Sequence, residues 1–68
     1  MARDDELVAA LVTEKRKVAD EAWGRLGEAG IPAVVITQPG IMGAYELIVQ
    51  VEASDLERAQ SLLTDLVP

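Results

Sequence analysis

Apolar residues in this chain occur in short runs whose spacing changes between that of strands and that of helices. The first run, residues 7–12, has the sequence LVAALV and the length of one strand. Because both of its faces would be apolar, this run is typical of a central or parallel strand, and its two alanines leave a helix as the alternative. Residues 1–5 are polar, and we expect them to form a frayed N-terminus.

A helical period follows over about residues 14–29. The apolar residues of this segment fall on one stripe at helical spacing: Val18, Ala19, Ala22, Leu26 and Ala29. We expect Thr13 to be the N-cap. The helix should end at Gly30, which is followed by Ile31 and Pro32. Glycine favours the left-handed conformation after a helix, and proline cannot continue one.

Two strands come next, separated by the turn sequence QPGIMG. Residues 33–37, AVVIT, are rich in β-branched side chains and predict a short strand. Residues 44–52 alternate as a half-buried strand does. One face carries Tyr45, Leu47, Val49 and Val51, and the other carries Glu46, Gln50 and Glu52, with Ile48 as its apolar exception.

A second helix is predicted over about residues 55–66. Ser54 and Glu57 have the spacing of a capping box, S-x-x-E, in which two side chains and two backbone amides bond reciprocally. The apolar stripe that follows consists of Leu56, Ala59, Leu62, Leu63 and Leu66.

The order β-α-β-β-α predicts an α+β fold for residues 6–68, a single small domain. If the third strand lies between the first two, the arrangement is ferredoxin-like and lacks the last strand, with both helices on one face of a three-stranded sheet. The outer edge of the first strand would then be unpaired, and the open face would carry an apolar patch around Ile48. Such features often mark interaction surfaces, and we expect a homodimer.

The amino-acid composition limits the kinds of site and partner that the chain can have. The 68 residues include no cysteine and no histidine, and the net charge is −6. Disulfides, thiolate metal sites and the commonest general base are therefore excluded, and we expect no cofactor. Nucleic acids and anionic membranes are poor partners for an acidic domain. We expect that the N-terminus is not a signal peptide, and no apolar run has the length of a membrane helix. We therefore expect a cytoplasmic location.

The GIMG sequence raises the question of a ligand-binding loop. A phosphate-binding glycine loop follows a strand and opens onto a helix, whereas this one lies between two strands. We interpret it as a hairpin turn whose glycines supply positive φ angles. The alternative is an interaction tip in which Ile41 and Met42 contact a partner.

Two further segments of the first helix are candidate sites. Trp23 lies at the edge of the apolar stripe, and Gly24 and Gly27 fall on the face away from the core. Together they suggest a subunit contact, and the alternative is a tryptophan at the rim of the core.

The first turn of the helix contains Lys15, Arg16 and Lys17, and cations at this end oppose the helix dipole. A bound anion would explain them, although solvated side chains explain them as well.

No combination of nucleophile, base and orienting residue is visible in the sequence, so we expect no enzyme activity.

The chain is similar to a family of small bacterial domains of unknown function named as prokaryotic signal-transducing proteins. The similarity lies in residues 19–35, ADEAWGRLGEAGIPAVV, and residues 46–63, ELIVQVEASDLERAQSLL. The resemblance covers about residues 6–66 and rests on structural motifs such as Gly30-Ile31-Pro32 and Glu57-Arg58-Ala59. It implies a regulatory, non-enzymatic role and brings no active site.

The pattern of that family does not include Trp23, Gly24 and Gly27.

From the fold and the resemblance together, we predict a regulatory domain that acts through protein contacts and self-associates. The alternative is a domain that senses a small metabolite at a subunit interface, which is an analogy at the level of the fold.

Overall fold

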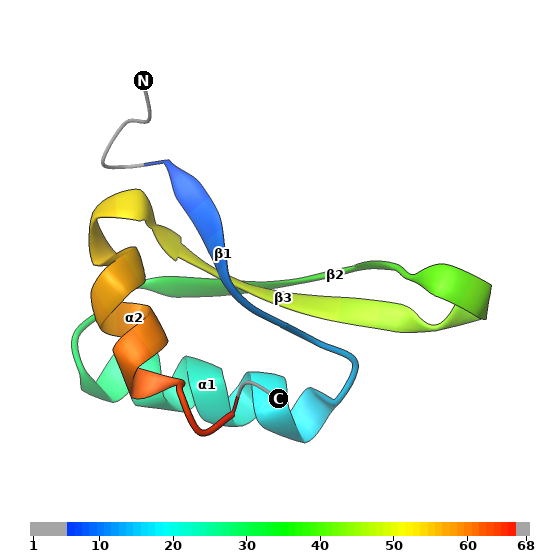
Figure 1. Cartoon of the computed structure of the whole chain (residues 1–68), viewed down its shortest axis with the longest axis horizontal. Helices are drawn as coiled ribbons and strands as arrows, with labels where there is room; N and C mark the ends of the chain where they lie inside the picture. Colours follow the sequence, from blue (N-terminus) through cyan, green and yellow to red (C-terminus); the bar gives the residue numbers. More distant parts are fainter. Residues whose placement is uncertain (1–5, 67–68) are drawn as a thin grey trace.

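The fold is an antiparallel three-stranded sheet that carries two helices on one face (Figure 1). The computed structural model describes residues 6–66, so the segment predicted to fray lies outside it. Its elements are β1 (Leu7–Thr13), α1 (Arg16–Glu28), β2 (Ala33–Pro39), β3 (Tyr45–Glu52) and α2 (Leu56–Leu62), with single 3₁₀ turns at Ile41–Gly43 and Ala53–Asp55. The predicted α+β class and the order β-α-β-β-α are confirmed.

The strand order is β1-β3-β2, which confirms that the third strand lies in the centre. Both outer strands pair antiparallel with β3, and Val49 of β3 is flanked by Leu11 of β1 and Val35 of β2. The sheet therefore has the ferredoxin-like arrangement without its last strand.

β1 is an edge strand, although its continuous apolar run is typical of a central or parallel strand. The pairing with β3 shifts register between Ala9 and Leu11. This bulge turns two consecutive residues, Ala10 and Leu11, toward the core, where both are buried. An apolar run without strict alternation is thus explained by the bulge rather than by a central position.

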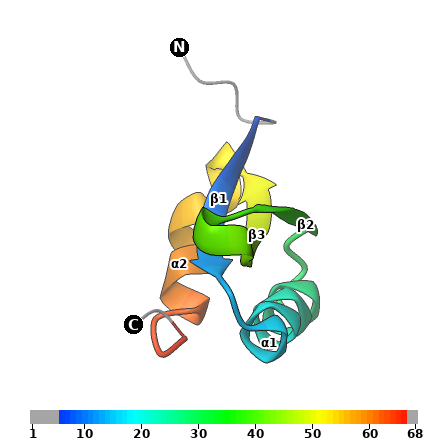
Figure 2. The same ribbon diagram turned by 90° about the vertical axis from the view of Figure 1, so that its right-hand side faces the viewer.

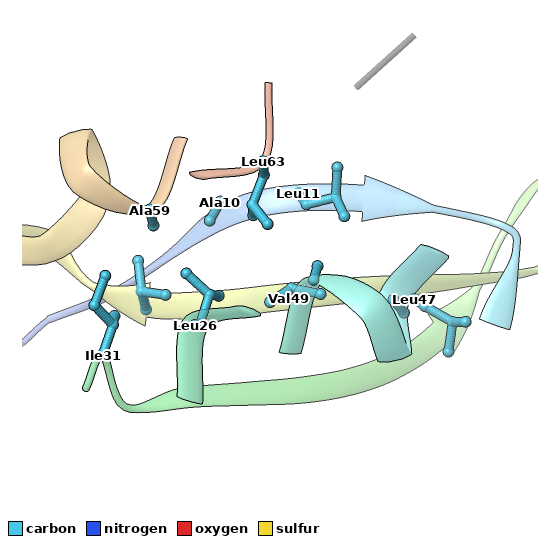
Figure 3. Close-up of a cluster of buried hydrophobic side chains, with 11 residues drawn as sticks. Ala10, Leu11, Leu26, Ile31, Leu47, Val49, Ala59 and Leu63 are labelled. Carbon is cyan, nitrogen blue, oxygen red and sulfur yellow. The ribbon is translucent and has the colours of Figure 1, made fainter. Parts of the chain in front are cut away.

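The core lies between the sheet and the two helices (Figure 3). Leu26 of α1, Ile31 after it, and Leu63 after α2 are nearly or completely buried against Val49 and other side chains of the inner sheet face. α1 contacts all three strands, whereas α2 contacts β1 and β3. Small side chains let the helices approach the sheet closely: Ala19, Ala22 and Ala59.

α1 begins later than predicted and ends as predicted. Thr13 is not its N-cap, because Lys15 holds that position and lacks a side-chain capping bond. The hydroxyl of Thr13 instead accepts a hydrogen bond from the backbone N–H of Lys15 at 3.1 Å, within the turn before the helix. At the other end, Gly30 adopts a φ of 77°, and the N–H of Ile31 donates to the carbonyl of Leu26 at 2.8 Å. This is the expected glycine-terminated end.

α2 is shorter than predicted, and the predicted capping box does not form. Asp55 is the N-cap and makes no side-chain capping bond, while Ser54 lies in the preceding 3₁₀ turn. The helix ends at Leu62, and side chains satisfy two of its last carbonyls. The hydroxyl of Thr64 lies 3.1 Å from the carbonyl of Gln60, and Arg25 of α1 donates to the carbonyl of Leu62 at 3.0 Å.

The β2–β3 hairpin extends beyond the helices (Figure 1), and its tip faces the viewer in Figure 2. β2 continues to Pro39, two residues past the predicted end, and pairs there with Tyr45. Tyr45 was predicted to share a face with the buried Leu47, yet it is exposed because no helix covers this end of the hairpin. The hairpin thus projects as an arm whose tip is the GIMG segment.

Candidate interaction surface

The sheet face opposite the helices is uncovered and largely apolar; we call it the open face. Its central row crosses all three strands, with Ile48 of β3 between Val12 of β1 and Ile36 of β2. Ile48 is only 9% exposed, whereas Val12 and Ile36 are 49% and 37% exposed. Leu7, Ala9 and Val34 extend the same face. An apolar patch around Ile48 was predicted, and the register now supplies its other members.

Carboxylates lie at both ends of the open face. Glu46 and Glu52 are on the same side of β3 as Ile48, and Gln50 lies between Ile48 and Glu52. The side-chain amide of Gln38 donates to Glu46 at 3.2 Å. Among the described strand positions on this face, none is basic. The open face therefore combines an apolar row with negative charge.

The two outer strands of the sheet differ in how readily another strand could pair with their free edges. β2 follows Pro32 and ends at Pro39, and the indole N–H of Trp23 donates to the carbonyl of Ala33 at 3.2 Å. Proline and a bonded carbonyl both hinder the addition of another strand. β1 contains no charged residue, proline or glycine, and in residues 6–66 it pairs with β3 alone. The bulge between Ala9 and Leu11 is the one feature of β1 that hinders pairing, so the β1 edge is the less protected of the two.

Trp23 lies on α1 beside the start of β2, with 55% of its surface exposed. Apart from its chain neighbours and the nearby backbone of α1, a Cβ atom added at Gly24 or Gly27 would meet no atom within 4 Å. The two glycines are thus not required by contacts inside the domain. Their predicted role in a subunit contact, together with Trp23, stays a prediction.

The GIMG segment is a hairpin turn, and its two large side chains point away from the core. Ile41 is 83% exposed and Met42 is 96% exposed. Gly43 has a φ of 81°, as predicted, but the second positive φ, 61°, belongs to Met42. Gly40 instead has φ −102°, and a Cβ atom there would lie 2.9 Å from the carbonyl oxygen of Ala44. Gly40 is therefore required by close contact.

The predicted anion site lies beside a shallow hollow at the turn from β1 to α1. Lys15 lines this hollow of about 380 Å³ together with Val12, Thr13, Glu14 and Glu46. Arg16 and Lys17 are exposed on the first turn of α1. Two carboxylates beside one ammonium group do not favour an anion, so the geometry adds no support to that prediction.

Comparison with known proteins adds no function. The chain matches no protein-family model, no curated protein and no solved structure. Among residues 6–66, no group of three or more histidine, cysteine or acidic side chains could hold a metal ion. In the same residues, no helix is long and apolar enough to cross a membrane.

Proposed function

We propose that this chain is a cytoplasmic, non-enzymatic regulatory domain that acts through protein contacts and self-associates by pairing β1 of two copies. The observation that carries the proposal is the uncharged edge of β1, the less protected edge of the sheet, beside an apolar open face. Unpaired backbone groups at such an edge bind another strand readily. The resemblance to signal-transducing domains also supports a regulatory role.

Antiparallel pairing of two β1 strands satisfies the symmetry of a dimer, because each copy offers the same edge to the other. The seven residues of β1 carry no charge, so no like charges face each other along the paired strands. Stacking two open faces would instead bring Glu46 and Glu52 of both copies together, which is unfavourable for a chain with a net charge of −6. The edge is therefore the better dimer contact.

The mass of the chain in solution tests this proposal. We expect light scattering after gel filtration to give a dimer for the wild type and a monomer for the variant Ala9→Lys/Val12→Lys. Both substitutions place a cation on the exposed side of β1, where the strands of two copies would be adjacent. Lysine is a residue that natural edge strands use against pairing.

The matched control is Val34→Lys/Ile36→Lys, which adds the same charge on the same face but on β2, the other outer strand. We expect this variant to remain a dimer. A monomeric wild type would contradict self-association. A control that dissociates together with the β1 variant would show that the open face, rather than the β1 edge, forms the contact.

Sensing of a small metabolite is the second candidate function, and the hollow beside Lys15 favours it. Its lining offers one ammonium group and two carboxylates, a set that suits a zwitterion such as a free amino acid. A ligand that binds only the folded state raises the melting temperature. Stabilisation by an amino acid, lost in Lys15→Ala, would support this candidate over the interaction domain.

A further inference from the structure

Beyond self-association, we propose that the open face binds a basic, amphipathic α-helix of another protein. This surface is distinct from the edge contact of β1. The inference rests on three properties of the open face: its width, the extent of its apolar row and the sign of its charges.

The width of the sheet suits one helix. The outer strands of a three-stranded sheet lie two strand spacings apart, roughly 9–10 Å. This is close to the diameter of a single α-helix, about 10–12 Å. The row of Val12, Ile48 and Ile36 spans this width, so the apolar stripe of one helix, lying along β3, would cover it.

The charges at the ends of β3 define where the cations of that helix belong. Glu46 and Glu52 are six residues apart on the same face, which corresponds to roughly 20 Å along a strand. A helix covers that length in about 13 residues. The binding segment would therefore have an apolar stripe of three to four turns, with lysine or arginine near each end. Lys15 lines the hollow at the margin of the open face together with Glu46.

Charge also selects against a second copy as the occupant. Two chains stacked by their open faces would oppose carboxylates to carboxylates, with a net charge of −6 on each chain. A cationic helix converts the same groups into attractive partners. The apolar row contributes affinity, and the two carboxylates contribute orientation and selectivity.

The experiment uses two fluorescently labelled peptides and the full chain. One peptide is an amphipathic helix with a leucine stripe and lysine and arginine near both ends, and the other carries glutamate at those positions. We expect saturable binding of the basic peptide alone, at one peptide per chain, measured by fluorescence anisotropy at low salt. This measurement does not depend on whether the chain is a monomer or a dimer.

Two charge-reversed variants locate the binding site. Glu46→Lys/Glu52→Lys should weaken binding of the basic peptide by roughly tenfold or more, since two attractions become repulsions. Glu28→Lys/Glu57→Lys changes the net charge equally, but on exposed positions of the helices, and should retain most of the affinity.

Three results of the binding experiment would overturn the proposal. These are equal affinity for both peptides, equal weakening by the two variants, and the lack of saturable binding up to about 1 mM peptide, a very weak affinity. A wild-type dimer that becomes monomeric in Val34→Lys/Ile36→Lys would also overturn it, because the open face would then be occupied by a second copy.

Discussion

Arg25 connects the two helices through its guanidinium group. It donates to the carbonyl of Leu62 and forms a bidentate pair with Asp65, in which the second bond measures 3.0 Å. Glu21 lies 3.6 Å away on the same helix. The hydrogen bond from Arg25 lowers the pKa of Asp65 from its usual 3.8. The folded chain therefore binds a proton at this carboxyl less readily than the unfolded chain does.

This lowered pKa predicts how Asp65→Asn depends on pH. The stabilisation is complete above the unfolded pKa, near 3.8, and is lost as the pH falls through the lower folded pKa. We expect the variant to melt below the wild type at neutral pH, and the difference to disappear in strong acid. Asp20→Asn, an exposed site on α1, controls for the lost charge. Equal melting of both variants at neutral pH would contradict the role of Arg25.

Single residues also show where sequence reasoning stops. The sequence predicted that both glycines of the GIMG turn adopt positive φ angles, and this holds for only one of them. Gly43 supplies a positive φ, as expected, whereas Gly40 is needed because the carbonyl of Ala44 approaches it closely. A close approach between residues paired across a turn depends on the register, which the local sequence does not specify.

At the scale of elements, periodicity predicted every helix and strand, and it failed mainly at their ends. Apolar residues recur where one side of a helix or strand faces the core, and their spacing in the sequence was sufficient to place α1 and β3. At the end of α2, carbonyls accept hydrogen bonds from Thr64 and from Arg25 of another element. A contact with another element leaves no periodic signal, and the predicted end at residue 66 was wrong. The capping box failed locally, because Ser54 lies in a 3₁₀ turn and Asp55 takes the N-cap position.

The sequence predicted that an apolar face and a free strand edge exist, but it did not predict which residues form the face around Ile48. Alternation identified Ile48 as an apolar residue on the uncovered face, and the strand order implied a free edge of β1. The neighbours of Ile48 required the register with both outer strands, including the bulge beside Ala10. The protection of the β2 edge by Trp23 required a hydrogen bond across ten residues.

The projecting hairpin gives a prediction at the same scale. Ile41→Ser/Met42→Ser should change the free energy of unfolding by no more than about 0.5 kcal/mol, since both side chains are largely exposed. Ile31→Ser removes a buried side chain and should cost about 2–5 kcal/mol, which approaches the whole stability of a domain this small. Urea denaturation measures both. A large loss in the tip variant would show that its side chains pack on the domain.

For the whole molecule, net charge gives the two proposed contacts opposite responses to salt. Each copy carries a charge of −6, so pairing of two copies is opposed by long-range repulsion that salt screens. Binding of a cationic helix to the open face is supported by attraction that salt screens equally. The screening length falls from about 30 Å at 0.01 M to about 10 Å at 0.1 M ionic strength.

We therefore expect added sodium chloride to strengthen self-association and to weaken binding of the basic peptide. Sedimentation equilibrium of the wild type measures the first effect, and peptide anisotropy measures the second, in the same buffers. Potassium glutamate in place of sodium chloride tests whether the effect follows ionic strength rather than one anion. Self-association that weakens with salt would mean that charge pairs hold the copies together, contrary to an uncharged β1 contact. Peptide binding insensitive to salt would remove the assigned role of Glu46 and Glu52 on the open face.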